Sequence, residues 1–451
     1  MMVADATTIS DRGVVGRRYP MQMDLKGTAL DGLTNWAGNF AYSAERLYEP
    51  ESLEQLQEVV RGSQRLRVLG SRHSFNSIAD SEGGLVSLAR MPRVFELDEV
   101  AGTVTVDGGV RYGDLCAPLN AAGFALHNLA SLPHISVAGA CATATHGSGN
   151  RSGNLATAVV AMDVVTADGE LVSFSRERDP DGFPGTVVGL GGLGVVTALT
   201  LRLEPAFQMR QDLYEHISLE QVAAHFDEIY ALADSVSLFS EWVGPGFEQV
   251  WLKRRVVAGD PFEPPDHVFG ATRATETIHP IKRMPSDACT PQLGVAGPWH
   301  ERMPHFLIDR MPSSGAELQT EYLLPREHAV AALLALADLR TTFQPLLQVA
   351  EVRTVAADDL WLSTAYGRPS VALHFTWQRD SDAVGRITPL IEAALAPFDP
   401  RPHWGKVFTM APSVVRAAYP RLPEFVELLQ RYDPNGMFRN AFVSRYIFGE
   451  E

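Results

Sequence analysis

Short alternating runs of apolar and polar residues, separated by glycine-rich turns, make up much of the first half of the chain. Leu66 and Val68 alternate with arginines up to Gly70, which is the two-residue period of a half-buried strand. Residues 159–174 contain two such runs joined by an Asp-Gly pair, which predicts a β-hairpin. Further strands are predicted at residues 84–87, 94–97, 103–107 and 195–203.

Helical periodicity is sparse in this first half and more frequent after Pro205. Ser52 is the predicted N-cap of an early helix, because its hydroxyl can accept from a free backbone N–H group of the first turn. Further helices are predicted at residues 112–122, 219–233 and 326–339, and later strands at residues 249–256 and 317–323. The change of pattern after Pro205 predicts a second domain, and the fold class is α+β.

Two stretches rich in small residues have the composition of anion-binding loops. In RLRVLGSRHSFN, Gly70 ends the strand and lets backbone N–H groups turn toward an anionic ligand, and His73 follows three residues later. Between Ala138 and Gly149 every residue except His146 is small, so the backbone can lie closely against a flat or phosphorylated ligand. The alternatives are an ordinary surface turn for the first stretch and close helix–strand packing for the second. Together the two stretches favour a diphosphate site.

Two motifs in the sequence match known signatures only in part. GLGGLG at residues 189–194 has the spacing of the dinucleotide fingerprint, but that fingerprint must open a helix, whereas residues 195–203 are strand-like. We therefore reject a Rossmann fold. The His-Glu pair at His300 is followed by His305 one residue too late for a helical zinc motif, and a proline intervenes. No metal site is predicted.

Composition narrows the class of partner. A length of 451 residues suggests two or three domains, and 45% hydrophobic with 20% charged residues is typical of a soluble globular protein. A net charge of −16 argues against nucleic acid or an anionic membrane surface as the main partner. Three scattered cysteines suggest neither a disulfide framework nor a zinc site. With no signal peptide or membrane span in the sequence, we expect a cytoplasmic protein, a monomer, with a small-molecule ligand.

Polar side chains occupy one face of otherwise apolar strands late in the chain. Glu351 and Arg353 alternate within QVAEVRT, and His374 and Thr376 alternate within VALHFTW, so each pair shares a face. The sequence HWGK adds Lys406 beside an aromatic residue. A solvent-facing side of the sheet would explain any one pair, but three such stretches favour a polar pocket. In contrast, the Lys-Arg-Arg run at residues 253–255 is interpreted as a solvated strand end.

Three of these stretches, GSRHSFN, SLPHISVAGACATATHGSG and YDPNGMFRNAF, resemble the vanillyl-alcohol oxidase superfamily of FAD enzymes. Within it, the HWGK and EVRTVAAD stretches and the overall length resemble the bacterial alditol oxidases most closely. The resemblance implies a two-subdomain FAD-binding domain (residues 33–205), an α+β substrate domain (206–405) over the isoalloxazine, and a C-terminal segment (406–451) that returns to the FAD domain. Residues 1–32 are expected to form a poorly ordered tail.

The resemblance also implies which residues bind the cofactor and the substrate. FAD is expected to be attached covalently to His73. Some relatives have a glycine where this chain has Arg72, which leaves the charge near the diphosphate open. The residues implied to contact FAD are Gly70, Ser71, Arg72, His73, Ser74, Ser131, Val137, Ala138, Gly139, Thr143, Thr145, His146, Gly147, Ser148 and Val195. Those implied to surround the substrate are Ser131, Glu351, Arg353, His374, Thr376 and Lys406.

The expected reaction is oxidation of the terminal hydroxyl of an alditol, such as xylitol or sorbitol, to the aldose. A hydride would pass to flavin N5, and dioxygen would be reduced to hydrogen peroxide. Glu351, Arg353, His374 and Lys406 are the expected catalytic residues, with Lys406 or His374 assisting proton removal and the base left open. One alternative is an aldonolactone oxidase or dehydrogenase, which shares the FAD loops. Another is a flavin-binding protein without turnover, which would not need the polar strands.

Overall fold

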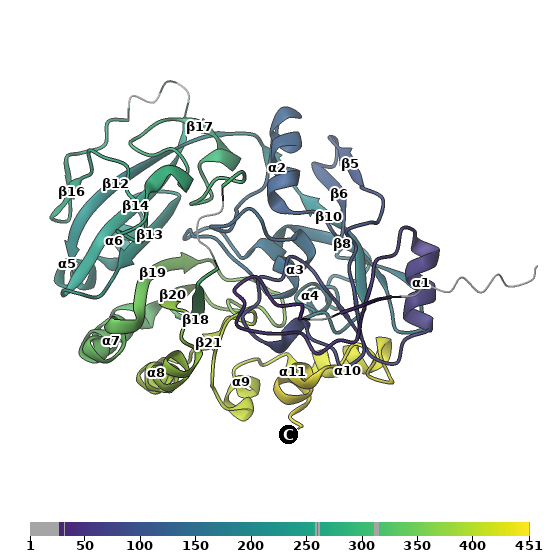
Figure 1. The fold of residues 1–451 in the computed structure, drawn as a ribbon. Coiled ribbons are helices and arrows are strands. Elements are labelled where there is room, and N and C mark those ends of the chain that lie inside the picture. The colour runs from purple at the N-terminus through teal and green to yellow at the C-terminus, as the bar shows by residue number, and fades with distance from the viewer. Residues whose placement is uncertain (1–26, 31, 258, 260–261, 311–314, 451) are drawn as a thin grey trace, which may run out of the picture.

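The computed structural model describes residues 27–450 except residues 31, 258, 260–261 and 311–314. Most of the expected N-terminal tail lies outside the described residues, but Thr28–Ala29 within it forms strand β1. Two units lie side by side in Figure 1. The unit that contains strands β1 to β11, here called the cofactor-side unit, lies to the right, and the unit built on strands β12 to β21, here called the substrate-side unit, lies to the left. The yellow C-terminal segment lies beneath the cofactor-side unit.

The cofactor-side unit contains two small sheets, which include all the strands predicted in this part of the sequence. The first has the order β1, β2 (Arg46–Tyr48), β4 (Gly84–Val86), β3 (Leu66–Val68), and helix α1 (Leu53–Arg61) is capped by the hydroxyl of Ser52. The second is antiparallel, in the order β5 (Phe95–Asp98), β6 (Thr103–Asp107), β10 (Val195–Arg202), β8 (Val159–Val165), β9 (Leu171–Ser175). Helices α2 (Tyr112–Ala121), α3 (Val137–Ala142) and α4 (Pro184–Val187) complete the unit, with β7 (Phe124–Ala125) pairing β11 (Glu204–Pro205).

The substrate-side unit is built on one ten-stranded antiparallel sheet. Its main path runs β15 (His267–Val268), β16 (Ala271–Arg273), β12 (Gln208–Ser218), β14 (Gly246–Val256), β13 (Ser235–Ser240), β19 (Leu347–Val355), β20 (Ser370–Gln378), β18 (Glu317–Pro325), β21 (Arg401–Pro402), and β17 (Gly297–Pro298) pairs β12. Helices α7 (Ala329–Phe343) and α8 (Ser381–Leu395) lie outside β18–β20, as Figure 1 shows.

The two faces of this sheet differ in polarity. Phe375 and Trp377 of β20 point to the helical side, where each ring lies edge-on to Phe343 of α7. Because successive side chains of a strand alternate between faces, His374 and Thr376 point to the opposite side, toward the cofactor-side unit. Helices α7 and α8 thus cover the apolar face of the sheet, which leaves the other face free to carry polar groups.

The C-terminal segment packs on the cofactor-side unit. It comprises α9 (Pro412–Ala417), α10 (Leu422–Tyr432) and α11 (Ala441–Val443). Leu66 donates to the carbonyl of Met437, and the amide of Asn440 donates to three carbonyls of the turn after Phe75. These bonds fix the loop that follows β3, the one carrying His73.

The predicted helix at residues 219–233 is instead two short helices, α5 (Leu219–Ala224) and α6 (Phe226–Tyr230). His225 separates them with φ −132° and ψ 29°, and its ring lies against Phe269. The strand predicted after GLGGLG is confirmed as β10, which supports the rejection of a Rossmann fold. No helix among the described residues is long and apolar enough to cross a membrane.

Candidate active site

A cavity of about 560 Å³ lies between the two units. One wall comes from the loop after β3 and the stretch around α3, and the other from the polar face of the large sheet. The two walls combine segments that lie more than 250 residues apart in the chain, such as Gly70 and Glu351. Both of the pocket-forming patterns recognised in the sequence therefore meet at one site.

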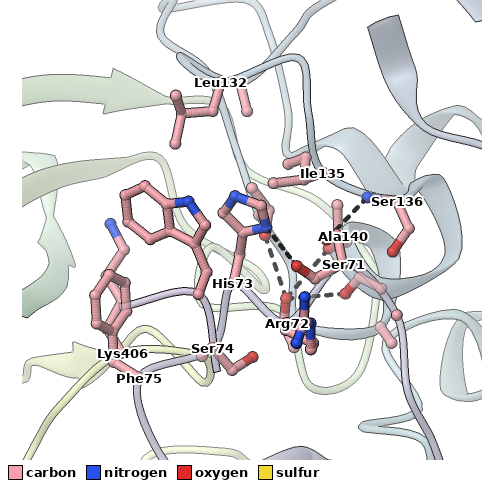
Figure 2. Close-up of a pocket in the computed structure, with 18 of the residues that line it drawn as sticks. Ser71, Arg72, His73, Ser74, Phe75, Leu132, Ile135, Ser136, Ala140 and Lys406 are labelled. Atoms are coloured by element: carbon pink, nitrogen blue, oxygen red, sulfur yellow. Dashed lines mark hydrogen bonds between the residues drawn. The ribbon is translucent and has the colours of Figure 1, made fainter. Parts of the chain in front are cut away.

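The cofactor-side wall is crowded at its glycines. A Cβ on either Gly70 or Gly139 would lie 2.8 Å from the Ser136 hydroxyl oxygen, closer than side-chain atoms normally approach. Ser136 in turn donates its backbone N–H to the hydroxyl of Ser71 at 3.2 Å (Figure 2). Glycine at these two positions keeps the loop after β3 and helix α3 close together and open to a ligand.

His73 lies at the base of this wall. Its Nδ1 is 2.9 Å from the carbonyl oxygen of Ser71, which can only accept, so Nδ1 carries the proton (Figure 2). The ring stacks on Trp36 at 5.2 Å between centroids. Burial lowers the pKa of His73 to about 4, so the imidazole is neutral near pH 7. Arg72 beside it has φ 62°, a backbone region that favours glycine.

Some of the residues predicted to bind the cofactor line the cavity, and others lie outside it. Ala138, Gly139, Thr143, Thr145 and His146 line the cavity, as do Gly70, Ser71, Arg72, His73, Ser74 and Ser131. The other four predicted cofactor residues, Val137, Gly147, Ser148 and Val195, are not among its lining residues.

Tight packing accounts for the four that miss the cavity. Val137 and Val195 are fully buried in the apolar core. The Ser148 hydroxyl donates to the carbonyl of Val236, and a Cβ on Gly147 would meet backbone and side-chain oxygens at 2.4 Å.

The substrate-side wall is a row of polar residues across three neighbouring strands. Strand register places Glu351 of β19 opposite His374 of β20, and His374 opposite Glu321 of β18. Arg353 and Thr376 extend the row on the same face, and all five line the cavity. The predicted pairing of faces is therefore confirmed.

Glu321 is the centre of this wall, and the sequence interpretation missed it. Its side chain is 1% exposed, and its two oxygens accept from Lys406 Nζ and from Arg353 Nη2, each at 2.6 Å. Burial alone would raise the pKa of Glu321, but the two cations hold it well below its usual range. One carboxylate thus orients both predicted catalytic cations.

The second carboxylate of the wall, Glu351, is also ionised. Burial would raise its pKa, but the Arg353 guanidinium and the His305 imidazole lower it well below its usual range. The pKa of Arg353 is raised because these two glutamates outweigh its burial. Two carboxylates and two cations therefore balance in charge within one buried cluster, which is the condition for stable buried ions.

His374 is neutral and held in one tautomer. Lys406 Nζ donates to its Nδ1 at 2.8 Å, so Nε2 carries the proton and faces the Thr376 hydroxyl at 3.0 Å. Burial, followed by the nearby Lys406 cation, lowers the pKa of His374 to about 3. Burial also lowers the pKa of Lys406, although Glu321 opposes this effect.

In the basic run at residues 253–255, the first residue differs from the solvated strand end that the sequence predicted. Lys253 is not solvated at a strand end but 1% exposed, and its ammonium bonds His305 Nδ1 at 3.0 Å. His305 Nε2 in turn lies 2.9 Å from Glu351 Oε1. The sequence treated this histidine only as part of a failed zinc motif, yet it lines the cavity.

Two family models match the two parts of this architecture. The family described as FAD binding domain matches residues 44–175, and the family described as D-arabinono-1,4-lactone oxidase matches residues 311–446. An alditol oxidase from Streptomyces sp. (strain IKD472 / FERM P-14339) is 50% identical over 92% of this chain and 99% of its own length. The chain belongs to the alditol oxidase family of the vanillyl-alcohol oxidase superfamily.

A more distant relative in sequence and a solved structure also match over most of their length. An L-gulono-1,4-lactone dehydrogenase from Mycobacterium tuberculosis is 29% identical over 92% of this chain and 98% of its own. The crystal structure of a cholesterol oxidase from B. sterolicum superposes with a TM-score of 0.74, covering 96% of this chain and 100% of that one. At 14% identity that likeness concerns the fold alone.

As a member of this family, the chain is an FAD-dependent oxidoreductase, and its cavity fits the cofactor. The loop carrying Gly70 and the helix carrying Gly139 supply a surface open to a flat, phosphorylated ligand.

Proposed function

We propose that this enzyme oxidises the terminal primary hydroxyl of alditols, such as xylitol and sorbitol, to the aldose. The observation that carries the proposal is the charge-balanced polar row on the substrate-side wall, in a chain 50% identical to an alditol oxidase. When bound, FAD supplies the hydride acceptor at N5 and passes the electrons to dioxygen, giving hydrogen peroxide.

The polar row suits a neutral ligand that offers only hydroxyl groups. Glu351 provides acceptors, the Arg353 guanidinium provides donors, and the hydroxyls of Ser131 and Thr376 can do both. A linear polyol needs several such groups at fixed positions, and a site built in this way rejects analogues that lack the hydroxyls. Because the cluster already balances its own charges, it does not call for a charged substrate.

We assign proton removal to Lys406. In its neutral form the amine keeps two N–H groups, which match its two bonds to Glu321 and His374, and its lone pair is then free for the substrate hydroxyl. After accepting the proton, the ammonium donates to the substrate oxygen. The lowered pKa of Lys406 makes the neutral form accessible. His374 has both ring nitrogens engaged and acts as a positioning residue.

We further propose that His73 bonds covalently to the flavin. Its buried, neutral ring has a nitrogen lone pair available for a bond to carbon, and the loop that carries it is fixed by the C-terminal segment. The three cysteines, all free and buried, are compatible with a cytoplasmic location, and we expect a monomer.

An aldonolactone oxidase or dehydrogenase is the second candidate, favoured by the match of residues 311–446 and by the relatives that act on lactones. Steady-state assays with peroxide detection separate the two. We expect xylitol or sorbitol to give a higher kcat/KM than L-gulono-1,4-lactone. A preference for the lactone would replace the proposed substrate class.

A further inference from the structure

Lys253 of β14 lies behind the substrate-side wall, and its bonds are fully specified. Its ammonium is within hydrogen-bond distance of the carbonyl of Met303 at 2.6 Å, the carbonyl of Pro304 at 2.9 Å and His305 Nδ1 at 3.0 Å. These three acceptors match the three N–H groups of a lysine. Lys253 does not line the cavity, so it is not placed to touch substrate or flavin.

Two bonds, one from Lys253 and one to the Glu351 carboxylate, determine which ring nitrogen of His305 carries the proton. Because Nδ1 accepts from the ammonium, the ring proton lies on Nε2, from which it is donated to Glu351 Oε1 at 2.9 Å. The backbone of His305 is held as well. Its N–H donates to the carbonyl of Ser131 at 3.2 Å, and its carbonyl accepts from the backbone N–H of Thr290 at 2.9 Å. The imidazole therefore has one position and one tautomer.

A packing role alone does not account for a lysine here. An apolar side chain of similar length would fill the same space without the cost of burying an ammonium whose bonded partners are carbonyls and an imidazole, not a carboxylate. Two titratable groups from neighbouring elements act on Lys253, namely the Glu351 carboxylate and the uncharged Cys289 thiol, whose pKa burial raises to about 12. Burial lowers the pKa of Lys253 to about 7, and that of His305 to about 4, which keeps the ring neutral.

We propose that Lys253 is a positioning residue of the active site, acting through the tautomer of His305 to hold one oxygen of Glu351 in place. The other oxygen, Oε2, then stays on the side of Arg353, 3.5 Å from its Nε, and is available to substrate. The role of Glu351 toward the polyol rests on the proposed function. The Lys253–His305–Glu351 chain does not, because it exists without substrate.

The first test is spectroscopic and needs no substrate. In the holoenzyme labelled with ¹⁵N-histidine, His305 is expected to show one protonated and one unprotonated ring nitrogen, with its signals assigned by their loss in His305→Gln. Lys253→Met removes the donor to Nδ1 and the nearby charge that, after burial, lowers the pKa of His305. Nδ1 should therefore take up a proton at a higher pH than in the parent, whereas the exposed-lysine control Lys282→Met should leave the signals unchanged. A His305 that keeps Nδ1 unprotonated over the same pH range as the parent would overturn the proposal.

The second test is a kinetic double-mutant cycle. A glutamine at 305 accepts through its oxygen and donates through its nitrogen, so it has no tautomer to set. We expect Lys253→Met to lower kcat/KM for xylitol by about 10- to 100-fold in the parent. In the His305→Gln background, the same change should cost less than about 3-fold. Equal losses in both backgrounds would reduce Lys253 to a packing residue. If xylitol is no substrate but Nδ1 of His305 still takes up a proton at a higher pH in Lys253→Met, the proposed function fails and the positioning role stands.

Discussion

Replacing Glu321 by glutamine removes the carboxylate that both buried cations share. Lys406 and Arg353 can only donate, whereas glutamine offers one acceptor oxygen and one donor nitrogen. At most one cation therefore keeps its 2.6 Å partner, and the other is left buried beside an N–H group. Breaking a buried ion pair from one side typically costs about 3–5 kcal/mol. For a protein unit of the size of the substrate-side unit, this loss of stability corresponds to a fall in Tm of roughly 6–20 °C.

Thermal unfolding of the holoenzyme, followed by circular dichroism, measures this loss. Glu392 provides a matched control because it is also buried but accepts from uncharged groups, namely the Tyr322 hydroxyl and the backbone and hydroxyl of Thr409. Glu392→Gln leaves no cation without its partner, so its Tm should fall by clearly less than that of Glu321→Gln.

Glu321→Gln should also change the pH dependence of kcat/KM. Glu321 raises the pKa of Lys406 against the lowering effect of burial, so its loss lowers that pKa further. If Lys406 must be neutral to accept a proton, the acidic limb of the kcat/KM profile should move to lower pH in Glu321→Gln. A Tm within about 2 °C of the parent, together with an unmoved acidic limb, would refute the assignment of Glu321 as the shared counter-charge.

Four further predictions concern the same cavity. Lys406→Ala should slow anaerobic flavin reduction by on the order of 10²-fold or more with unchanged FAD content, and Lys406→Arg should not restore it, because guanidinium does not deprotonate near neutrality; a parental rate in the alanine variant would make Lys406 a bystander. Acid precipitation should leave the flavin with the parent protein but release it from His73→Ala. Shortening the polyol from xylitol to glycerol should lower kcat/KM, at about 1–3 kcal/mol for each hydroxyl whose buried partner is left unpaired; equal efficiencies would contradict the polar pocket. The Tm should fall as pH drops from about 6.5 toward 4, because the unfolded chain binds protons that His73, His305 and His374, with pKa values lowered by burial to about 4, 4 and 3, do not bind when folded; His305→Gln should flatten this slope.

The parts of the site that could be predicted from the sequence are those fixed by local periodicity. Alternation along a strand places Glu351 with Arg353 and His374 with Thr376 whatever the rest of the fold, and the structure confirms both pairs. The glycine loop before His73 was likewise recognisable, because Gly70 ends an alternating strand and a histidine follows three residues later.

The residues that were missed depend on contacts between distant segments. The partners of Glu321, Arg353 and Lys406, lie 32 and 85 residues away in the chain. Its local signal was the alternation of Glu317 and Gln319 with it on one face of β18, a pattern that a solvent-facing strand also shows. Lys253 looked like a charged strand end, and only the return of residues 303–305 over β14 buries it.

Anaerobic mixing of the holoenzyme with xylitol isolates the transfer of electrons from substrate to flavin. We expect the yellow absorbance to bleach completely and to return after air is admitted and the xylitol is used up, with one peroxide formed per xylitol oxidised. L-gulono-1,4-lactone at the same concentration should bleach it more slowly. A flavin that stays oxidised with xylitol and sorbitol, in protein that holds its full complement of FAD, would contradict the account.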